Sequence, residues 1–109
     1  MDVLYVKASR LRSVYMDDRR LYEQALNADF LFIDDLGAES EDCVCYLNHE
    51  YPLASAICSR YDRRKVTVIS TNFTLDAIGE RYGQRVLERI FEDYAISKFD
   101  GESIRLYNR

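Results

Sequence analysis

The sequence predicts an α/β fold built on a parallel sheet, and two patterns lead to this prediction. Short apolar segments rich in β-branched residues alternate with longer segments whose apolar residues recur at helical spacing. The short segments are unbroken runs, which is typical of strands buried on both faces. Strands that are separated by helices form parallel sheets, because the chain must cross a face of the sheet before each new strand.

The first quarter of the chain predicts one strand and one interrupted helix. Val3–Lys7 is short, apolar and aromatic, and predicts a strand. Apolar residues then recur at helical spacing as far as Leu26, with Ser9 as a candidate N-cap. The pair Asp17-Asp18 is where this helix is expected to break.

The middle of the chain predicts a second strand and a second helix. Residues 30–33 form a continuous apolar run, after which residues 34–37 are expected to leave the sheet. Residues 38–51 are polar and are expected to be irregular. Pro52 fits the first position of the helix that follows.

The C-terminal part predicts three more extended segments. Residues 66–70, 95–99 and 104–107 are the candidate strands, and Asp100-Gly101 is the candidate turn between the last two. Two helices should lie between the first two of these strands, because Thr74 is a good N-cap and Gly83 a good terminator.

Composition and charge exclude several classes of protein. The 109 residues are 48% hydrophobic and 31% charged, which indicates one small globular domain or part of a larger one rather than a disordered chain. No apolar run reaches the roughly 20 residues of a membrane span, and the N-terminus does not resemble a signal peptide, so a cytoplasmic protein is expected. The net charge of −4 argues against a chain that grips nucleic acid alone.

Two local clusters have structural explanations. Arg60, Arg63, Arg64 and Lys65 lie where a helix should end, where the helix dipole favours cations. The other cluster, Cys43-x-Cys45 with the only histidine, His49, offers three ligands at most, whereas structural zinc normally takes four. These thiols and Cys58 are therefore expected to be reduced and without metal.

Polar residues follow two of the predicted strands directly. Asp34 and Asp35 come after the second strand, and Asn72 follows residues 66–70. Ligands of parallel sheets bind at the carboxyl ends of strands, and a carboxylate pair suits Mg²⁺ and a polarised water. The simpler alternative is a solvated strand end with an ordinary turn, to which Asn72 would also belong.

Four segments together resemble one family. "ADFLFIDDLGAE", "RYDRRKVTVISTNFT", "ERYGQRVLERI" and "FDGESIR" are similar, in this order, to motifs of the DnaC/IstB family of AAA+ ATPases. The family includes helicase loaders of DNA replication and helper ATPases of transposition. The resemblance covers nearly the whole chain, so residues 1–109 are expected to be part of an AAA+ core, from Walker B to sensor 2. It implies a three-layer P-loop NTPase sheet, truncated at its N-terminal side.

The resemblance implies a site for ATP and Mg²⁺. Asp34 matches the Walker B acid that holds Mg²⁺ through water, and Asp35 matches the acid that polarises the attacking water. Asn72 matches the sensor-1 residue, which contacts the γ-phosphate or the water.

Three arginines also have counterparts in the family. Arg89 matches the arginine finger, with Arg85 as the second choice, and Arg105 matches a sensor-2-like arginine. Surface ion pairs with Glu88 and Glu92 are the alternative for Arg85 and Arg89.

One departure from the family limits the expected activity. No Gly-Lys-Thr or Gly-Lys-Ser run exists, since none of the three lysines follows a glycine. The chain alone is therefore expected neither to bind ATP tightly nor to hydrolyse it. By the same resemblance, these residues are expected not to include the helicase-binding domain of the loaders. Partners implied for the longer protein are a replicative helicase or a transposase, and single-stranded DNA. The alternatives are a nucleotide-free scaffold on the same fold, or an unrelated α/β domain.

The missing loop also leaves a gap in the expected sheet. The family order is 5-1-4-3-2, with the P-loop strand between the fourth and fifth strands. Either residues 95–99 close up against residues 66–70, or an edge stays open. An open edge favours pairing with another chain, so a dimer or a strand-swapped form is expected.

Overall fold

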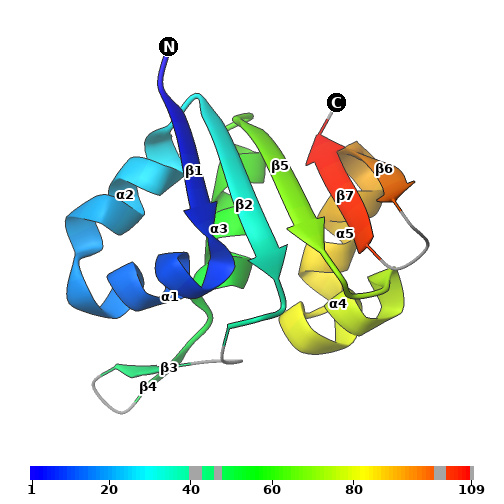
Figure 1. Cartoon of the computed structure of the whole chain (residues 1–109). Coiled ribbons are helices and arrows are strands. Elements are labelled where there is room, and N and C mark those ends of the chain that lie inside the picture. The colour runs from blue at the N-terminus through cyan, green and yellow to red at the C-terminus, as the bar shows by residue number, and fades with distance from the viewer. Residues whose placement is uncertain (40–42, 46–47, 100–102, 109) are drawn as a thin grey trace.

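The structure is a computed structural model that describes residues 1–39, 43–45, 48–99 and 103–108 (Figure 1). Its elements, in chain order, are β1 (Val3–Lys7), α1 (Ala8–Asp17), α2 (Arg19–Asn27), β2 (Phe30–Leu36), β3 (Cys43–Cys45), β4 (Asn48–Glu50), α3 (Pro52–Asp62), β5 (Val66–Thr71), α4 (Leu75–Tyr82), α5 (Gln84–Asp93), β6 (Tyr94–Phe99) and β7 (Ser103–Asn108). The chain is α/β, as its sequence predicts.

The main sheet has the strand order β1-β2-β5-β7-β6. β1, β2 and β5 are parallel neighbours, so the prediction of a parallel sheet is correct for these three strands. Their register places Tyr5 beside Phe32, and Phe32 beside Val68. Residues in register lie on the same face, so each such row crosses the sheet.

The C-terminal strands differ from the prediction. β6 does not close up against β5, because β7 lies between them and is antiparallel to both. Antiparallel strands need only a short connection, so the chain can fold back from β6 and fill the place beside β5. The edge of β5 is therefore paired. The predicted turn at Asp100-Gly101 lies outside the described residues.

The helices form one continuous layer. α3 contacts α1, α2 and α5, and α5 contacts α4. Figure 1 shows α3 and α5 behind the sheet. Within the described ranges no helix covers the opposite face, so this part of the chain has two layers and not the expected three. The core lies between sheet and helices and includes Leu31, Ile33 and Ile69 of the strands.

Burial along the strands alternates, which corrects the prediction that they are buried on both faces. Leu31, Ile33, Thr67 and Ile69 point into the core and are fully buried. Their neighbours point to the other side, which we call the open face. The open face consists of Val3, Tyr5, Phe30, Phe32, Val66 and Val68, all exposed or half-buried. The continuous apolar runs do form strands, but in the described residues helices pack on only one face of the sheet.

Most of the predicted helix signals are present. Asp18 separates α1 from α2, and its carboxylate accepts from the Leu21 amide as an N-cap. Thr74 caps α4 in the same way, and Gly83 ends it with a φ of 102°. Ser9 is not an N-cap, since α1 begins one residue earlier with Lys7 in the cap position.

Arg60 corrects the interpretation of the basic cluster. Its side chain is 0% exposed and donates to the carbonyls of Ala25, Leu26, Ala28 and Val66 and to the Thr67 hydroxyl. Three of these carbonyls belong to the end of α2 and the residue that caps it, so the guanidinium satisfies the C-terminus of a neighbouring helix rather than its own.

Residues 38–51 are not irregular throughout. β3 and β4 pair as a small antiparallel sheet, with Cys43 beside Glu50 and Val44 beside His49. The prediction of metal-free thiols at Cys43 and Cys45 concerns side chains outside the described part of the structure. No helix in the described part is long and apolar enough to cross a membrane.

Candidate functional site

The acidic pair lies inside a strand and not after it. β2 runs on to Leu36, but its register with β5 shifts between Ile33 and Leu36, and Asp35 has a φ of 60°. This is a β-bulge, which re-aims side chains where the pairing is interrupted. The expectation that residues 34–37 leave the sheet is therefore wrong up to Leu36. The bulge leaves Asp34 half-buried and Asp35 exposed.

Asp34 is held by the strands on both sides of it. The Ser70 hydroxyl of β5 donates to Oδ1 of Asp34, and the Tyr5 hydroxyl of β1 donates to Oδ2. The hydrogen bond to the Asp34 carboxylate raises the pKa of Tyr5 above its ordinary value. The amide of Asp35 donates to the Ser70 oxygen at 2.9 Å, which joins the two acids through one hydroxyl.

The sequence did not single out Tyr5 or Ser70 as site residues. Neither belongs to a short motif around the two acids. The signal that identifies them is strand register. Tyr5 lies in one row with Phe32 and Val68, and Asp34 and Ser70 each follow two residues later on the same face.

Asn72 lies at the same edge of the sheet as the acids. It directly follows β5, and it is exposed. The preceding Thr71 fixes this edge, since its hydroxyl donates to the Leu36 carbonyl at 2.6 Å and accepts from the Phe73 amide at 3.0 Å. The structure thus brings Asp34, Asp35 and Asn72 to one edge.

Glu39 braces the loop that follows β2. Its side chain is buried, accepts from the Gly37 amide at 2.9 Å and from the Tyr82 hydroxyl, and forms an ion pair with Arg81 at 3.6 Å. Burial and the Glu39 carboxylate raise the pKa of Tyr82. The sequence contains Glu39 only as the end of a motif, and gives no sign of its partners on α4.

Gly37 permits the same loop to turn. Its φ of 108° is unfavourable for any residue with a side chain, and an added Cβ would lie 2.6 Å from the Phe73 ring. The loop after the acids is therefore fixed by backbone geometry at Gly37 and by the contacts of Glu39.

Of the other predicted arginines, Arg89 lies away from this edge, and Arg105 lies on the strand next to β5. Arg89 lies on α5 in the helix layer, with its guanidinium 4.6 Å from the ring centre of Tyr61 on α3. Its Nε is buried and has no hydrogen-bond partner among the described residues. Glu92, one of the alternative partners, accepts from the Tyr61 hydroxyl at 2.7 Å. Arg105 lies in β7 at the register position opposite Ser70, so β5 lies between its backbone and the acids on β2.

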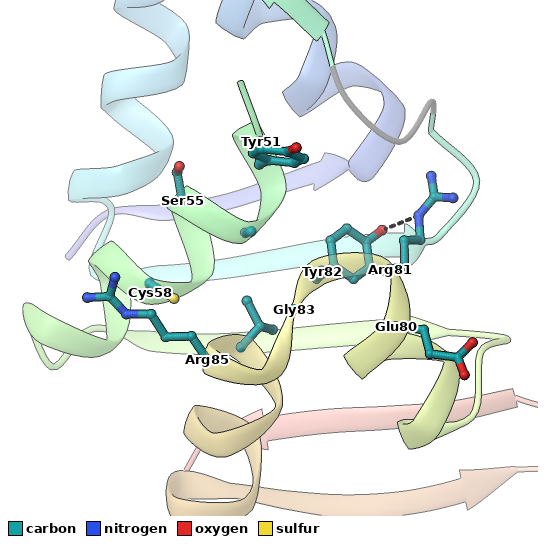
Figure 2. A pocket seen from close by; sticks show the side chains of 10 residues that line it. Tyr51, Ser55, Cys58, Glu80, Arg81, Tyr82, Gly83 and Arg85 are labelled. Carbon is teal, nitrogen blue, oxygen red and sulfur yellow. Dashed lines mark hydrogen bonds between the residues drawn. The ribbon is translucent and has the colours of Figure 1, made fainter. Parts of the chain in front are cut away.

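Arg85 lines a pocket on the helix side. A cavity of about 420 Å³ lies between α3 and the α4–α5 corner, with Tyr51, Cys58 and Arg85 in its wall. Figure 2 shows the Arg85 side chain reaching toward Cys58. Burial raises the pKa of the Cys58 thiol, against the opposing charges of Arg85 and Arg89. A protonated thiol is a poor nucleophile, so the pocket offers no evident chemistry.

The acidic edge fits a magnesium ion better than a transition metal. Nowhere in the described residues do three His, Cys, Asp or Glu side chains gather as a metal site. Mg²⁺ needs only one or two carboxylates when phosphate oxygens and water complete its shell, and Asp34 and Asp35 provide those carboxylates. The sequence offers no glycine-lysine loop to hold the phosphates.

Comparisons with models of protein families, with curated proteins and with solved structures find no match for this chain.

Proposed function

We propose that this chain is the acid-bearing part of a DnaC/IstB-type ATPase core, which serves DNA replication as a helicase loader or serves transposition. The observation that carries the proposal is the edge formed by β2 and β5. There, Asp34 is fixed by Ser70 and Tyr5, and Asp35 is held in an exposed bulge beside it. Asn72 follows on the neighbouring strand.

Each residue of this edge has a distinct part in the proposed hydrolysis. Mg²⁺ bound to ATP would neutralise the charge that develops on the phosphates. Asp34 would hold the ion through water, and its two hydroxyl donors fix the orientation of its carboxylate. Asp35 would accept a proton from the attacking water, and Asn72 would orient that water by a hydrogen bond.

The two arginines that the resemblance assigns to the nucleotide have different proposed roles. Arg89 lies on α5, away from Asp34 of its own chain, and an arginine finger acts on the nucleotide of a neighbouring subunit. Arg105 is proposed to act near the nucleotide of its own chain, because its strand position is opposite Ser70.

The order of the strands supports the proposal in part. The sequence of neighbours β1-β2-β5 is the one that the resemblance implies for the second, third and fourth strands of the core. β7 lies between β5 and β6, where the resemblance places the P-loop strand. In a complete core, β7 would therefore have to leave this position.

Nucleotide binding by a longer protein tests the proposal. The experiment joins the chain to an upstream segment of its own gene that carries a Gly-Lys-Thr-type loop, and measures binding of a non-hydrolysable ATP analogue with Mg²⁺. Micromolar binding is expected for this protein, and loss of binding for its Asp34→Ala variant. The matched control is Asp62→Ala, which removes an exposed aspartate from α3 and should bind normally. Equal binding by both variants would refute the role of Asp34.

A second candidate function is a nucleotide-free scaffold on the same fold. The open face favours it, because an uncovered apolar sheet is suited to assembly rather than to catalysis. Failure of the longer protein to bind any nucleotide would favour this candidate.

A further inference from the structure

The pocket between α3 and the α4–α5 corner contains none of the acids of the proposed ATPase site. Its volume of about 420 Å³ is within the range of small-molecule sites in proteins. Ala54 and Val86 give its wall an apolar part, and Tyr51 and Tyr82 contribute aromatic rings (Figure 2). A wall of this composition is suited to a small molecule with a planar apolar body.

Tyr82 is a preformed part of this wall. Its hydroxyl donates to the Glu39 carboxylate and accepts from Nε of Arg81 at 3.1 Å. Arg81 also forms an ion pair with Glu39 at 3.6 Å, so the positive charge of Arg81 is already balanced. The ring of Tyr82 is therefore held in place before any ligand binds, which reduces the entropy that binding costs.

Arg85 is the cation of the wall that lacks a partner. Its exposed side chain extends from α5 toward Cys58 of α3 (Figure 2). Among the described residues it forms no hydrogen bond or ion pair. Glu88 lies three residues further along α5, at a spacing that permits an ion pair, but this pair is not formed. The guanidinium of Arg85 is therefore available to a ligand.

The surroundings of the Cys58 thiol are positive in sum. Burial raises the pKa of this thiol and the charge of Asp62 raises it further, whereas the charges of Arg85 and Arg89 lower it. The effect of each arginine on this pKa is larger than that of Asp62. Glu80, an acid of the pocket wall, lies on α4 and extends away from Arg85 (Figure 2). A negative group is therefore stabilised at the Cys58 end of the pocket.

We propose that this pocket binds a small planar organic acid, whose anionic group contacts Arg85 and whose ring packs against Tyr82 and Val86. A guanidinium donates two parallel hydrogen bonds to a carboxylate, which fixes the orientation of the acid. Binding is reversible, because the protonated thiol of Cys58 is a poor nucleophile. The proposal is independent of the proposed ATPase function, since no nucleotide and none of the acids of β2 take part.

A titration of the isotope-labelled chain with 2-naphthoate, followed by NMR, tests the proposal. The dissociation constant should be about 1 mM or lower, as is usual for a ligand of this size. The largest changes in amide shifts should occur at residues 54–58 and 82–86, which form two sides of the pocket. The uncharged 2-naphthamide has the same ring and should bind at least about tenfold more weakly, because it lacks the ion pair with Arg85.

Arg85→Met tests the contact with the anionic group. The substitution should weaken binding of 2-naphthoate by at least about tenfold and leave binding of 2-naphthamide unchanged, because only the acid uses the guanidinium. Arg85 is exposed, so the variant should fold, and circular dichroism checks this. The matched control is Arg10→Met, which removes the same charge from an exposed position on α1 and should bind both compounds normally.

Three results would overturn the proposal. The first is a titration with 2-naphthoate in which the amides of residues 54–58 and 82–86 do not shift. The second is equal affinity for the acid and the amide, or an unchanged affinity of Arg85→Met for the acid, since the pocket would then select only for an apolar ring. The third is tighter binding of the cation 2-naphthylmethylammonium than of 2-naphthoate, which would show that Glu80 and not Arg85 determines the charge of the ligand.

Discussion

At the scale of single residues, the side chains with the most hydrogen bonds and ion pairs are not the ones that the sequence motifs identify. Glu39 is 6% exposed and binds groups on two separate segments, the Gly37 amide and the Arg81–Tyr82 pair. A buried carboxylate of this kind is stable only while its donors remain in place. The loop that follows the acidic pair therefore depends on α4, an element more than thirty residues further along the chain.

Replacement of Glu39 tests this dependence. Glu39→Gln keeps the size of the side chain but removes the charge that Arg81 faces in a poorly solvated place. The free energy of unfolding should fall by about 1–3 kcal/mol, measured by urea denaturation. Glu80→Gln, at an exposed position on the same helix that supplies Arg81, should change it by less than about 0.5 kcal/mol. Similar decreases in the free energy of unfolding for the two variants would show that the contacts of Glu39 do not stabilise the loop.

Tyr82 makes stability depend on pH in the alkaline range. Burial and Glu39 raise the pKa of Tyr82 in the folded chain, whereas in the unfolded chain it loses its proton near its ordinary value of 10.0. The stabilisation is complete below this value and is lost as the pH rises above it, since only the unfolded state ionises there. Unfolding between about pH 9 and about pH 11 should show a smaller decline for Tyr82→Phe than for the unmodified chain. Parallel declines would contradict the assigned environment of Tyr82.

At the scale of elements, the sequence predicts which segments form helices and strands better than it predicts how they are covered. The strand at Val3–Lys7, the break near Asp18, the start of α3 at Pro52 and the end of α4 at Gly83 all depend on nearest neighbours, and all are as predicted. The bulge at Asp35 depends on pairing with β5, so no local pattern indicates it.

The environment of Arg60 also depends on residues that are distant in the sequence. Its position near the end of α3 is readable from the sequence, but its partners lie on α2 and β5, more than thirty residues away in the case of α2. A search for charge clusters therefore assigns it to the surface, while the structure places it in the core.

Arg60→Met should destabilise the chain strongly. Methionine fills a similar volume but leaves the carbonyls at the end of α2 and the Val66 carbonyl without a donor. The expected loss is about 3–5 kcal/mol in urea denaturation, enough to unfold a domain of marginal stability. Arg10→Met, at an exposed position on α1, should have little effect. A loss below about 1 kcal/mol for Arg60→Met would contradict the role given to its hydrogen bonds.

At the scale of the whole molecule, the apolar strands and the single layer of helices belong together. The sequence has strands apolar enough for burial on both faces, and the described chain covers one of them. Which segment packs on each face of a sheet depends on how the layers assemble. The apolar pattern of a strand therefore predicts that both faces are buried, but it does not predict which segment buries them. The position of β7 is likewise not predictable from its own sequence, because it depends on which strand can pair with β5.

The central claim of the account is that the chain carries the acids of a nucleotide site without the element that holds the phosphates. Calorimetry of the chain as given, with ATP and Mg²⁺ and with Asp34→Ala as the comparison, tests it most directly. The account predicts no detectable heat for either protein, and binding of the ATP analogue only after an upstream glycine-lysine loop has been joined to the chain. Micromolar binding by the chain alone that is abolished in Asp34→Ala would contradict the account, because another part of this chain would then hold the phosphates.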